Sequence, residues 1–327
     1  MIKIVRIVGA ILLTAVLLVI ASRASRGKPE FVSHAENGFL FEMTTLPKFA
    51  ENSRARINLR ITGPLTEEIQ PSLRYARSEK DDLTNLTAYR VHPLILADST
   101  SGSYFAELST AARGGRIQYY VEIVDQDQKQ LASFWQENGK PFFIKYFGDV
   151  PRVVLLPHIA FMFATVFCVA MASLCALSVI KGSEPPTNML KYLFWGVVMT
   201  FIGGYPFGFA MNWYAFGGLW EGVPFGTDAT DNKTQLLFVY LIFATTIGLR
   251  SLTGGKCGRD LFSARVLGWY GLGALAVMLF IYLIPHSIQF SRTLTNAFCY
   301  GFIGFWGLVY LFGWFRSRSG LPTIKQS

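Results

Sequence analysis

Residues 153–180 read VVLLPHIAFMFATVFCVAMASLCALSVI, a run without a single charged side chain. An α-helix needs about 20 consecutive apolar residues to cross the hydrocarbon core of a bilayer. The stretch therefore predicts a membrane-spanning helix. The composition agrees with this, because 51% of the 327 residues are hydrophobic and the mean hydropathy is +0.34, which excludes an ordinary soluble protein.

Further apolar runs lie on both sides of this one, at about 4–21, 190–211, 235–250, 265–285 and 294–315. The first is short for a span, so residues 1–25 are either an N-terminal transmembrane anchor or a signal segment cleaved after Ala24. Arg23 and Arg26 frame that cleavage point, which favours the anchor. Residues 151–318 are expected to form a five-helix transmembrane domain.

The net charge of +9 is predicted to lie on one side of the membrane. If the segment between the first two spans is exported, the cytoplasmic segments hold eleven cations and two acids, and the exported segments are nearly neutral. This distribution follows the positive-inside rule and is not a basic surface for nucleic acid. The sequence therefore predicts a lipid bilayer as partner, and no nucleic acid.

Residues 30–150 have the pattern of β-strands. Between Ala55 and Ile61, apolar residues alternate with polar ones, a period of two with one buried face. Short strands of this kind, separated by repeated turn signals, predict an antiparallel β-sandwich. All four cysteines lie outside this segment, so it must fold without disulfides.

The stretch RIQYYVEIVDQDQK, residues 116–129, resembles the late strand hairpin of immunoglobulin-like and fibronectin-type-III modules. The resemblance implies that kind of sandwich. The expected fold class is thus an α+β membrane protein, with an extracytoplasmic immunoglobulin-like or fibronectin-III-like sandwich and an α-helical transmembrane bundle.

Candidate ligands meet at the predicted outer face of the membrane domain. His158 lies near the outer end of the second span and His286 at the outer end of the fifth, while Asp228 and Asp231 belong to an aromatic, glycine-rich loop over 203–234 on the same side. Neutral imidazole binds haem iron, copper and zinc, and carboxylates ligate or orient it. The sequence predicts that the two histidines bind haem b or a transition metal, with the aspartates as metal ligands or supporting groups.

A structural interpretation of the same residues stays open. Each histidine follows a proline, Pro157 or Pro285, and could bond carbonyls at an irregular helix end. Thr230 or Asp231 could cap the next helix, with the aromatic residues forming a belt at the headgroups.

Two family resemblances bear on this choice. PHIAFMFATVFCVAMASLCAL, residues 157–177, resembles the histidine-bearing helix of cytochrome b561-type membrane proteins, which implies haem b on His158. Those proteins use several helix-borne histidines for two haems, whereas this membrane domain has two histidines. The resemblance therefore implies at most one bis-histidine haem, with His286 as the second ligand.

The second resemblance covers three stretches of the membrane half: HIAFMF (158–163), YAFGGLWEGVPFGTDATDNKT (214–234) and LIPHS (283–287). They are similar to a group of bacterial multispan membrane proteins without an assigned function. This implies that the loop and both histidines form one feature, and that the protein is a multi-pass protein of the bacterial inner membrane.

Two functions follow as hypotheses. In the first, the outer-face site serves redox chemistry or electron transfer. In the second, the protein is a non-catalytic accessory or scaffold subunit of a bacterial envelope complex, and its sandwich binds other membrane or periplasmic proteins. No nucleophile or metalloprotease motif is present, so no catalytic residue is assigned and an enzymatic activity stays open.

Overall fold

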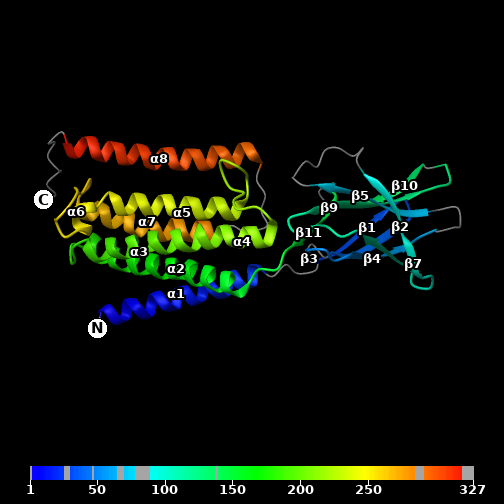
Figure 1. The fold of residues 1–327 in the computed structure, drawn as a ribbon, viewed down its shortest axis with the longest axis horizontal. Coiled ribbons are helices and arrows are strands. Elements are labelled where there is room, and N and C mark those ends of the chain that lie inside the picture. The colour runs from blue at the N-terminus through cyan, green and yellow to red at the C-terminus, as the bar shows by residue number, and fades with distance from the viewer. Residues whose placement is uncertain are drawn as a thin grey trace. The chain divides into compact units, whose positions relative to one another are not determined.

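The computed structural model describes residues 2–25, 30–45, 48–64, 70–78, 89–127, 129–136, 139–283 and 291–318. The chain forms two compact units (Figure 1). The helical unit comprises residues 1–26, 151–212 and 219–327. The β unit comprises residues 27–150 and the short segment Trp213–Gly218.

The helical unit is built from eight helices within the described ranges. They are α1 (Ile2–Ser25), α2 (Arg152–Ile180), α3 (Thr187–Gly204), α4 (Pro206–Phe216), α5 (Ala229–Thr246), α6 (Leu249–Leu252), α7 (Ala264–Leu283) and α8 (Arg292–Arg318), with the end of α4 in the β unit. Five stretches are long and apolar enough to cross a membrane: α1, α2, α3 with α4, α7 and α8. The protein is therefore a membrane protein, and five of the six predicted spans are confirmed as apolar helices.

The remaining predicted span, 235–250, differs from expectation. It is helical as part of α5, but α5 does not belong to the five apolar helices, since Asp231, Asn232 and Lys233 occupy its first turns. All three side chains are nevertheless buried. Buried polar side chains need hydrogen-bond partners, and at this end of α5 the Asp231 carboxylate and Asn232 Oδ1 have them.

The expectation of one surface loop over 203–234 is wrong for about half of its length. Residues 206–216 form α4, and α5 begins at Ala229, so irregular chain is confined to Tyr205 and to residues 217–228. The latter segment is here called the α4–α5 loop. Pro206 is the first residue of α4, where its missing N–H costs no hydrogen bond. The glycines and aromatic residues of this stretch had suggested turns rather than a helix.

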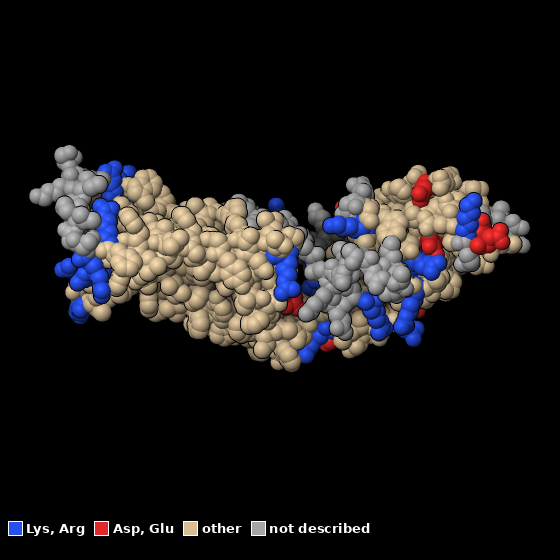
Figure 2. All heavy atoms as spheres, turned by 90° about the horizontal axis from the view of Figure 1, so that it is seen from above, with Lys and Arg blue, Asp and Glu red and all other residues tan. Residues whose placement is uncertain are grey.

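Cations gather at one end of the helical unit. Figure 2 shows Lys and Arg at the end that holds α6 and the C-terminal end of α8, while the flank seen in that view is uncharged. Arg250 lies in α6, and Arg316 and Arg318 lie in the last turn of α8. This arrangement agrees with the charge segregation on which the predicted topology rests. The side of the membrane on which this end lies remains a prediction.

The β unit contains two sheets. Their strands are β1 (Glu30–Glu36), β2 (Phe39–Thr45), β3 (Lys48–Ala50), β4 (Ala55–Thr62), β5 (Gln70–Ser78), β6 (Arg90–Pro93), β7 (Ile95–Asp98), β8 (Ser103–Leu108), β9 (Arg116–Val124), β10 (Gln130–Phe134) and β11 (Phe142–Phe147). One sheet has the order β1-β2-β4-β8-β7, and the other has β3-β11-β9-β5-β6 with β10 also on β9. All pairs are antiparallel except β3 with β11.

One core joins the two sheets. The predicted alternation of β4 is confirmed, with its odd-numbered residues buried and its even-numbered ones exposed. Phe41 and Ile57 from the first sheet share an apolar cluster with Val121 and Ile144 from the second. The segment Trp213–Gly218 adds a contact of its own, since the Gly148 N–H donates to the Ala215 carbonyl at 3.0 Å. The β unit thus buries a continuous core without a disulfide.

Cysteine labelling tests the predicted topology. Cys257 is exposed and Cys168, Cys175 and Cys299 are buried, while Phe225 in the α4–α5 loop is 81% exposed. We expect an impermeant maleimide applied to intact spheroplasts to label Phe225→Cys in a Cys257→Ser background. The parent protein, which keeps Cys257, should label only after the membrane is permeabilised. Labelling of Cys257 in intact spheroplasts would show that the predicted topology is inverted.

Candidate functional site

The Asp231 carboxylate organises the junction between the α4–α5 loop and α5. It is 7% exposed, and both of its oxygens accept from Asn212 Nδ2 of α4, each at 3.0 Å. Oδ2 also accepts the backbone N–H of Glu221, at 2.7 Å. One carboxylate therefore ties together α4, the loop and α5. Two donor groups, which make three hydrogen bonds, meet the need of a buried carboxylate for partners that replace water.

The rest of the α4–α5 loop is fixed by the next polar side chains of α5. Asp228 is the N-cap, and its Oδ1 accepts from the N–H groups of Thr230 and Asp231 at 2.8 and 3.1 Å. Asn232 Oδ1 accepts the N–H of Val223 at 2.8 Å. A capping aspartate is worth about 1 kcal/mol. The cap is thus Asp228, and the expectation of Thr230 or Asp231 in that role is wrong.

Aromatic rings cover this polar junction. Trp220 of the loop stacks on Tyr205, with ring centroids 5.7 Å apart and planes 11° apart, and meets Phe209 edge-on. Trp220 Nε1 donates to the Val223 carbonyl at 3.3 Å. At Gly222, a Cβ would lie 2.9 Å from both Trp220 and Asp231, so a side chain there would displace one of them. The aromatic residues serve the loop as packing partners.

His158 lies on α2, one residue after Pro157. Its Nδ1 is 2.9 Å from the Gly203 carbonyl on α3, and because a carbonyl only accepts, Nδ1 carries the proton. Nε2 is then the atom with a free lone pair. Gly203 packs against Phe161 and Met162 of α2, which holds the carbonyl close to the imidazole. The histidine is therefore both a link between two helices and a candidate ligand through Nε2.

The predicted ligand set is only partly described. His286 lies outside the described residues. Asp231 accepts a backbone N–H of the α4–α5 loop, and Asp228 accepts one of α5. Within the described ranges, no group of three or more His, Cys, Asp or Glu side chains is arranged to hold a metal ion. The ligand roles of His158, His286, Asp228 and Asp231 stay predictions.

The comparisons with known proteins give no family. No family model matches the chain, and no curated protein matches it. The function therefore has to be inferred from the geometry of the two units.

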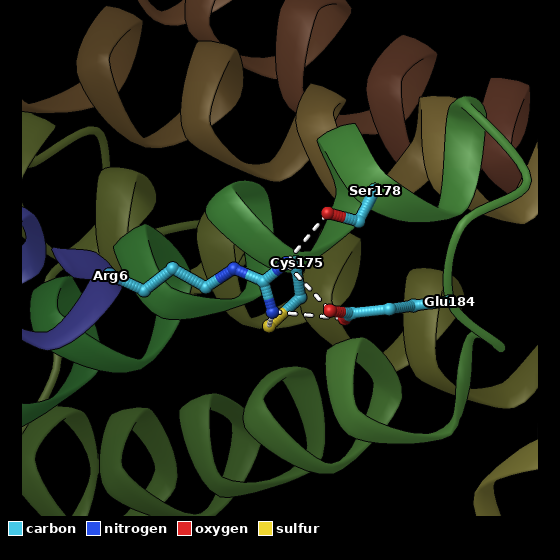
Figure 3. Close-up of polar contacts among 4 residues, drawn as sticks. All are labelled: Arg6, Cys175, Ser178 and Glu184. Atoms are coloured by element: carbon cyan, nitrogen blue, oxygen red, sulfur yellow. Dashed lines mark hydrogen bonds and ion pairs between the residues drawn. The ribbon is translucent and has the colours of Figure 1, made fainter. Parts of the chain in front are cut away.

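A second polar cluster ties α1 to the rest of the helical unit (Figure 3). Arg6 of α1 donates through both terminal nitrogens to the two carboxylate oxygens of Glu184, each at 2.9 Å. Its guanidinium also donates to Ser178 Oγ at 2.6 Å and lies 3.6 Å from Cys175 Sγ. The pairing is the bidentate geometry in which arginine binds carboxylates most strongly. It places the start of α1 beside the α2–α3 connection.

The β unit carries an open hollow of about 600 Å³. It is lined by His34 and Glu36 of β1, Ser133 of β10, and Trp135, Gln136 and Gly139 of the following turn. Glu36 Oε2 accepts from both the N–H and the hydroxyl of Ser133, so the carboxylate joins the edges of the two sheets. Trp135 is stacked on Tyr120 at 3.9 Å between centroids. An aromatic ring, a carboxylate and an imidazole thus face one space.

Sequence reasoning missed this hollow, because His34 stands alone in the chain. Glu36 and Ser133 are 97 residues apart, so only the strand pairing of the folded unit brings them together. One clue was available. Glu36 immediately precedes Asn37-Gly38, the preferred sequence of a two-residue hairpin turn, which identifies its strand and the next one as neighbours.

Replacing Asp231 should loosen the α4–α5 junction. Asp231→Ala removes the acceptor of three hydrogen bonds and leaves Asn212 and the Glu221 N–H without partners, at an expected cost of about 3 kcal/mol. Asp231→Asn keeps an amide oxygen and should cost less than half as much. Thermal unfolding of the purified protein in detergent measures both. Equal unfolding temperatures for the two variants would contradict the role given to the carboxylate.

The Arg6–Glu184 pair should have a defined pH dependence. The hydrogen bond from Arg6 holds the pKa of the Glu184 carboxyl below its ordinary value. A lowered acid pKa stabilises the fold above the ordinary pKa of glutamate, and this contribution is lost as pH falls through the folded-state pKa. The difference in unfolding temperature between wild type and Glu184→Gln should therefore shrink between neutral pH and about pH 3. If the difference in unfolding temperature stays constant with pH, the Arg6–Glu184 pair does not contribute to the stability of the fold.

Proposed function

We propose that this protein is a non-catalytic accessory subunit of a bacterial envelope membrane complex, with the helical unit as its anchor and the β unit as its partner-binding module. The observation that carries the proposal is the hollow on the β unit, lined by His34, Glu36 and Trp135. It is an open hollow on the surface and not an enclosed cavity, which suits contact with a side chain of a partner protein. In the helical unit, by contrast, Asp228 and Asp231 of the α4–α5 junction accept hydrogen bonds from backbone N–H groups of the same chain.

We further propose that the β unit is an immunoglobulin-like or fibronectin-III-like module. The strand order supports this assignment. The neighbours β2, β4, β8 and β7 follow one another as strands A, B, E and D do, and β6, β5, β9 and β11 as C′, C, F and G do. Strand β1 then lies outside this plan, as an extra strand beside the position of A. Modules of this architecture serve many functions, so the proposed role rests on the surface and not on the fold.

The proposed location is the bacterial inner membrane, with the β unit on the extracytoplasmic side. Support comes from the cations at the α6 end of the helical unit and from the tie between Arg6 and Glu184. The tie also supports the retention of α1 as an anchor, because cleavage would remove Arg6 from its partners. The proposed partners are therefore other membrane or periplasmic proteins.

A specific observation favours a second candidate, an electron-transfer role with haem b or a transition metal. The hydrogen bond from His158 Nδ1 to the Gly203 carbonyl fixes the tautomer that leaves Nε2 for a ligand. Metal-binding histidines are commonly oriented by such a bond to a backbone carbonyl. His158 and His286 would be the ligands in this role.

Spectroscopy and metal analysis decide on the second candidate. If it holds, the protein purified without chelator shows a b-type reduced-minus-oxidised spectrum or carries stoichiometric copper or zinc. The variants His158→Ala and His286→Ala should each abolish that signal, because each removes one ligand. A protein free of both haem and metal would refute this candidate and leave the accessory role.

Photocrosslinking in cells tests the accessory role. A photoreactive amino acid at Gly139, beside the hollow, should form a distinct adduct with a partner protein, whereas one at Leu96 of β7 should not. Leu96 is a matched control because it is exposed on another edge of the same unit. Trp135→Ala should remove the adduct, since it alters the hollow. The absence of an adduct at Gly139, or equal adducts at both positions, would contradict the proposal.

A further inference from the structure

The free edge of β1 has unpaired backbone groups. β1 and β2 form a hairpin through Asn37 and Gly38, both with positive φ, and all seven residues of β1 pair with β2 without a register shift. In a two-residue hairpin the closing pair, here Glu36 with Phe39, is hydrogen-bonded, and hydrogen-bonded pairs then alternate along the strands. The N–H and C=O groups of Phe31, Ser33 and Ala35 therefore point away from β2.

Nothing in the part of the chain that the structure describes pairs with that edge. Phe31 is 65% exposed, and no strand adjoins β1 on the side away from β2. An exposed edge of this length is a template for another strand. Natural proteins protect such edges with proline, register shifts, short strands or covering groups.

The other described edge strands have that protection. β6 contains Pro93 and has four residues, and β3 has three. β7 pairs with β8 through a register shift. β10 is covered, because Asn37 Nδ2 donates to the Leu131 carbonyl at 2.7 Å and Glu36 accepts from the Ser133 N–H. β1 is thus the described edge that remains both long and regular.

The hollow lies beside this edge and sets the chemistry of a ligand. His34 and Glu36 share the face of β1 that is turned to the core, since His34 stacks on Phe134 and Glu36 bonds Ser133. Among the described residues Glu36 accepts its hydrogen bonds through Oε2, and Trp135 lines the same space. A carboxylate next to an indole ring suits a lysine or arginine side chain, whose stem packs on the ring and whose charge meets the acid.

A second copy of β1 would fit this edge poorly. In an antiparallel pair of two β1 strands centred on Ser33, Glu30 would face Glu36 twice. Like charges directly opposite each other destabilise a strand pair. The charge pattern of the edge, with glutamates at both ends of β1, instead favours an incoming strand that carries cations.

We propose that the β1 edge binds an extended, cationic segment of a partner protein as an added strand, with one lysine or arginine side chain in the hollow against Glu36 and Trp135. Backbone hydrogen bonds to Phe31, Ser33 and Ala35 supply affinity, and the hollow supplies specificity, as in other complexes formed by strand addition. This inference rests on the accessory role and names the partner's chemistry.

Fluorescence anisotropy with the full-length protein in detergent tests the mode of binding. The probe is a labelled nine-residue peptide of alternating threonine and valine in which one central valine is replaced by lysine. Ser33→Pro removes the central free N–H of β1 without breaking a bond to β2, and should weaken binding about tenfold or more. Ser33→Ala is the matched control, because it keeps the N–H, and should bind as wild type does.

A second comparison tests the hollow. A peptide with norleucine in place of lysine should bind about tenfold more weakly, and Glu36→Gln should abolish that difference while still accepting the Ser133 N–H. Unchanged binding to Ser33→Pro, equal affinity for both peptides, or no binding of the lysine peptide would overturn the inference. If the Gly139 adduct persists in any of these cases, the accessory role stands with a different mode of recognition.

Discussion

A backbone that leaves a helix inside a packed bundle must find new hydrogen-bond partners, and the α4–α5 junction shows how this chain meets that constraint. Residues 217–228 are irregular, yet Asp228, Asp231 and Asn232 accept their N–H groups or those of the first turn of α5. Each side chain replaces a bond that a continuous helix would have made. As a result α5 begins with polar residues and does not belong to the five apolar helices, while α3, α4 and α5 gain a fixed connection.

Much of the architecture could be predicted from local pattern. The apolar runs predicted five of the long helices, and the alternation from Ala55 to Ile61 predicted β4, because both periodicities report directly on burial. The part of α4 that lies beyond the predicted span 190–211 was missed, since its aromatic residues are also typical of loops. Local sequence pattern carries little information about α4, because its Asn212 is bonded to Asp231, nineteen residues further along the chain.

The candidate sites depended on contacts that no local pattern contains. Arg6 and Glu184 are separated by 178 residues, and Glu36 and Ser133 by 97. The predicted ligands, whose roles stay predictions, show a different difficulty, because residue types suited to metal binding are equally suited to capping helices and bonding backbone groups. Asp228 and Asp231 act as acceptors for backbone amides here, and His158 bonds a carbonyl of the next helix. The residue type limits the chemistry that a side chain can perform, whereas its hydrogen-bond partners in the fold show which of these roles it has.

The tie between Arg6 and Glu184 has a consequence for the order of biogenesis. The first helix leaves the ribosome long before its acidic partner exists, since translation at about 5–20 residues per second needs roughly 10–40 s to reach it. During that interval the guanidinium lacks its Glu184 partner and stays hydrated or among lipid headgroups. Residues 27–150 of the β unit are synthesised in the meantime. Lateral packing of the first helix is therefore a late event in the assembly of this protein, set by the synthesis of α2 and the turn that follows it.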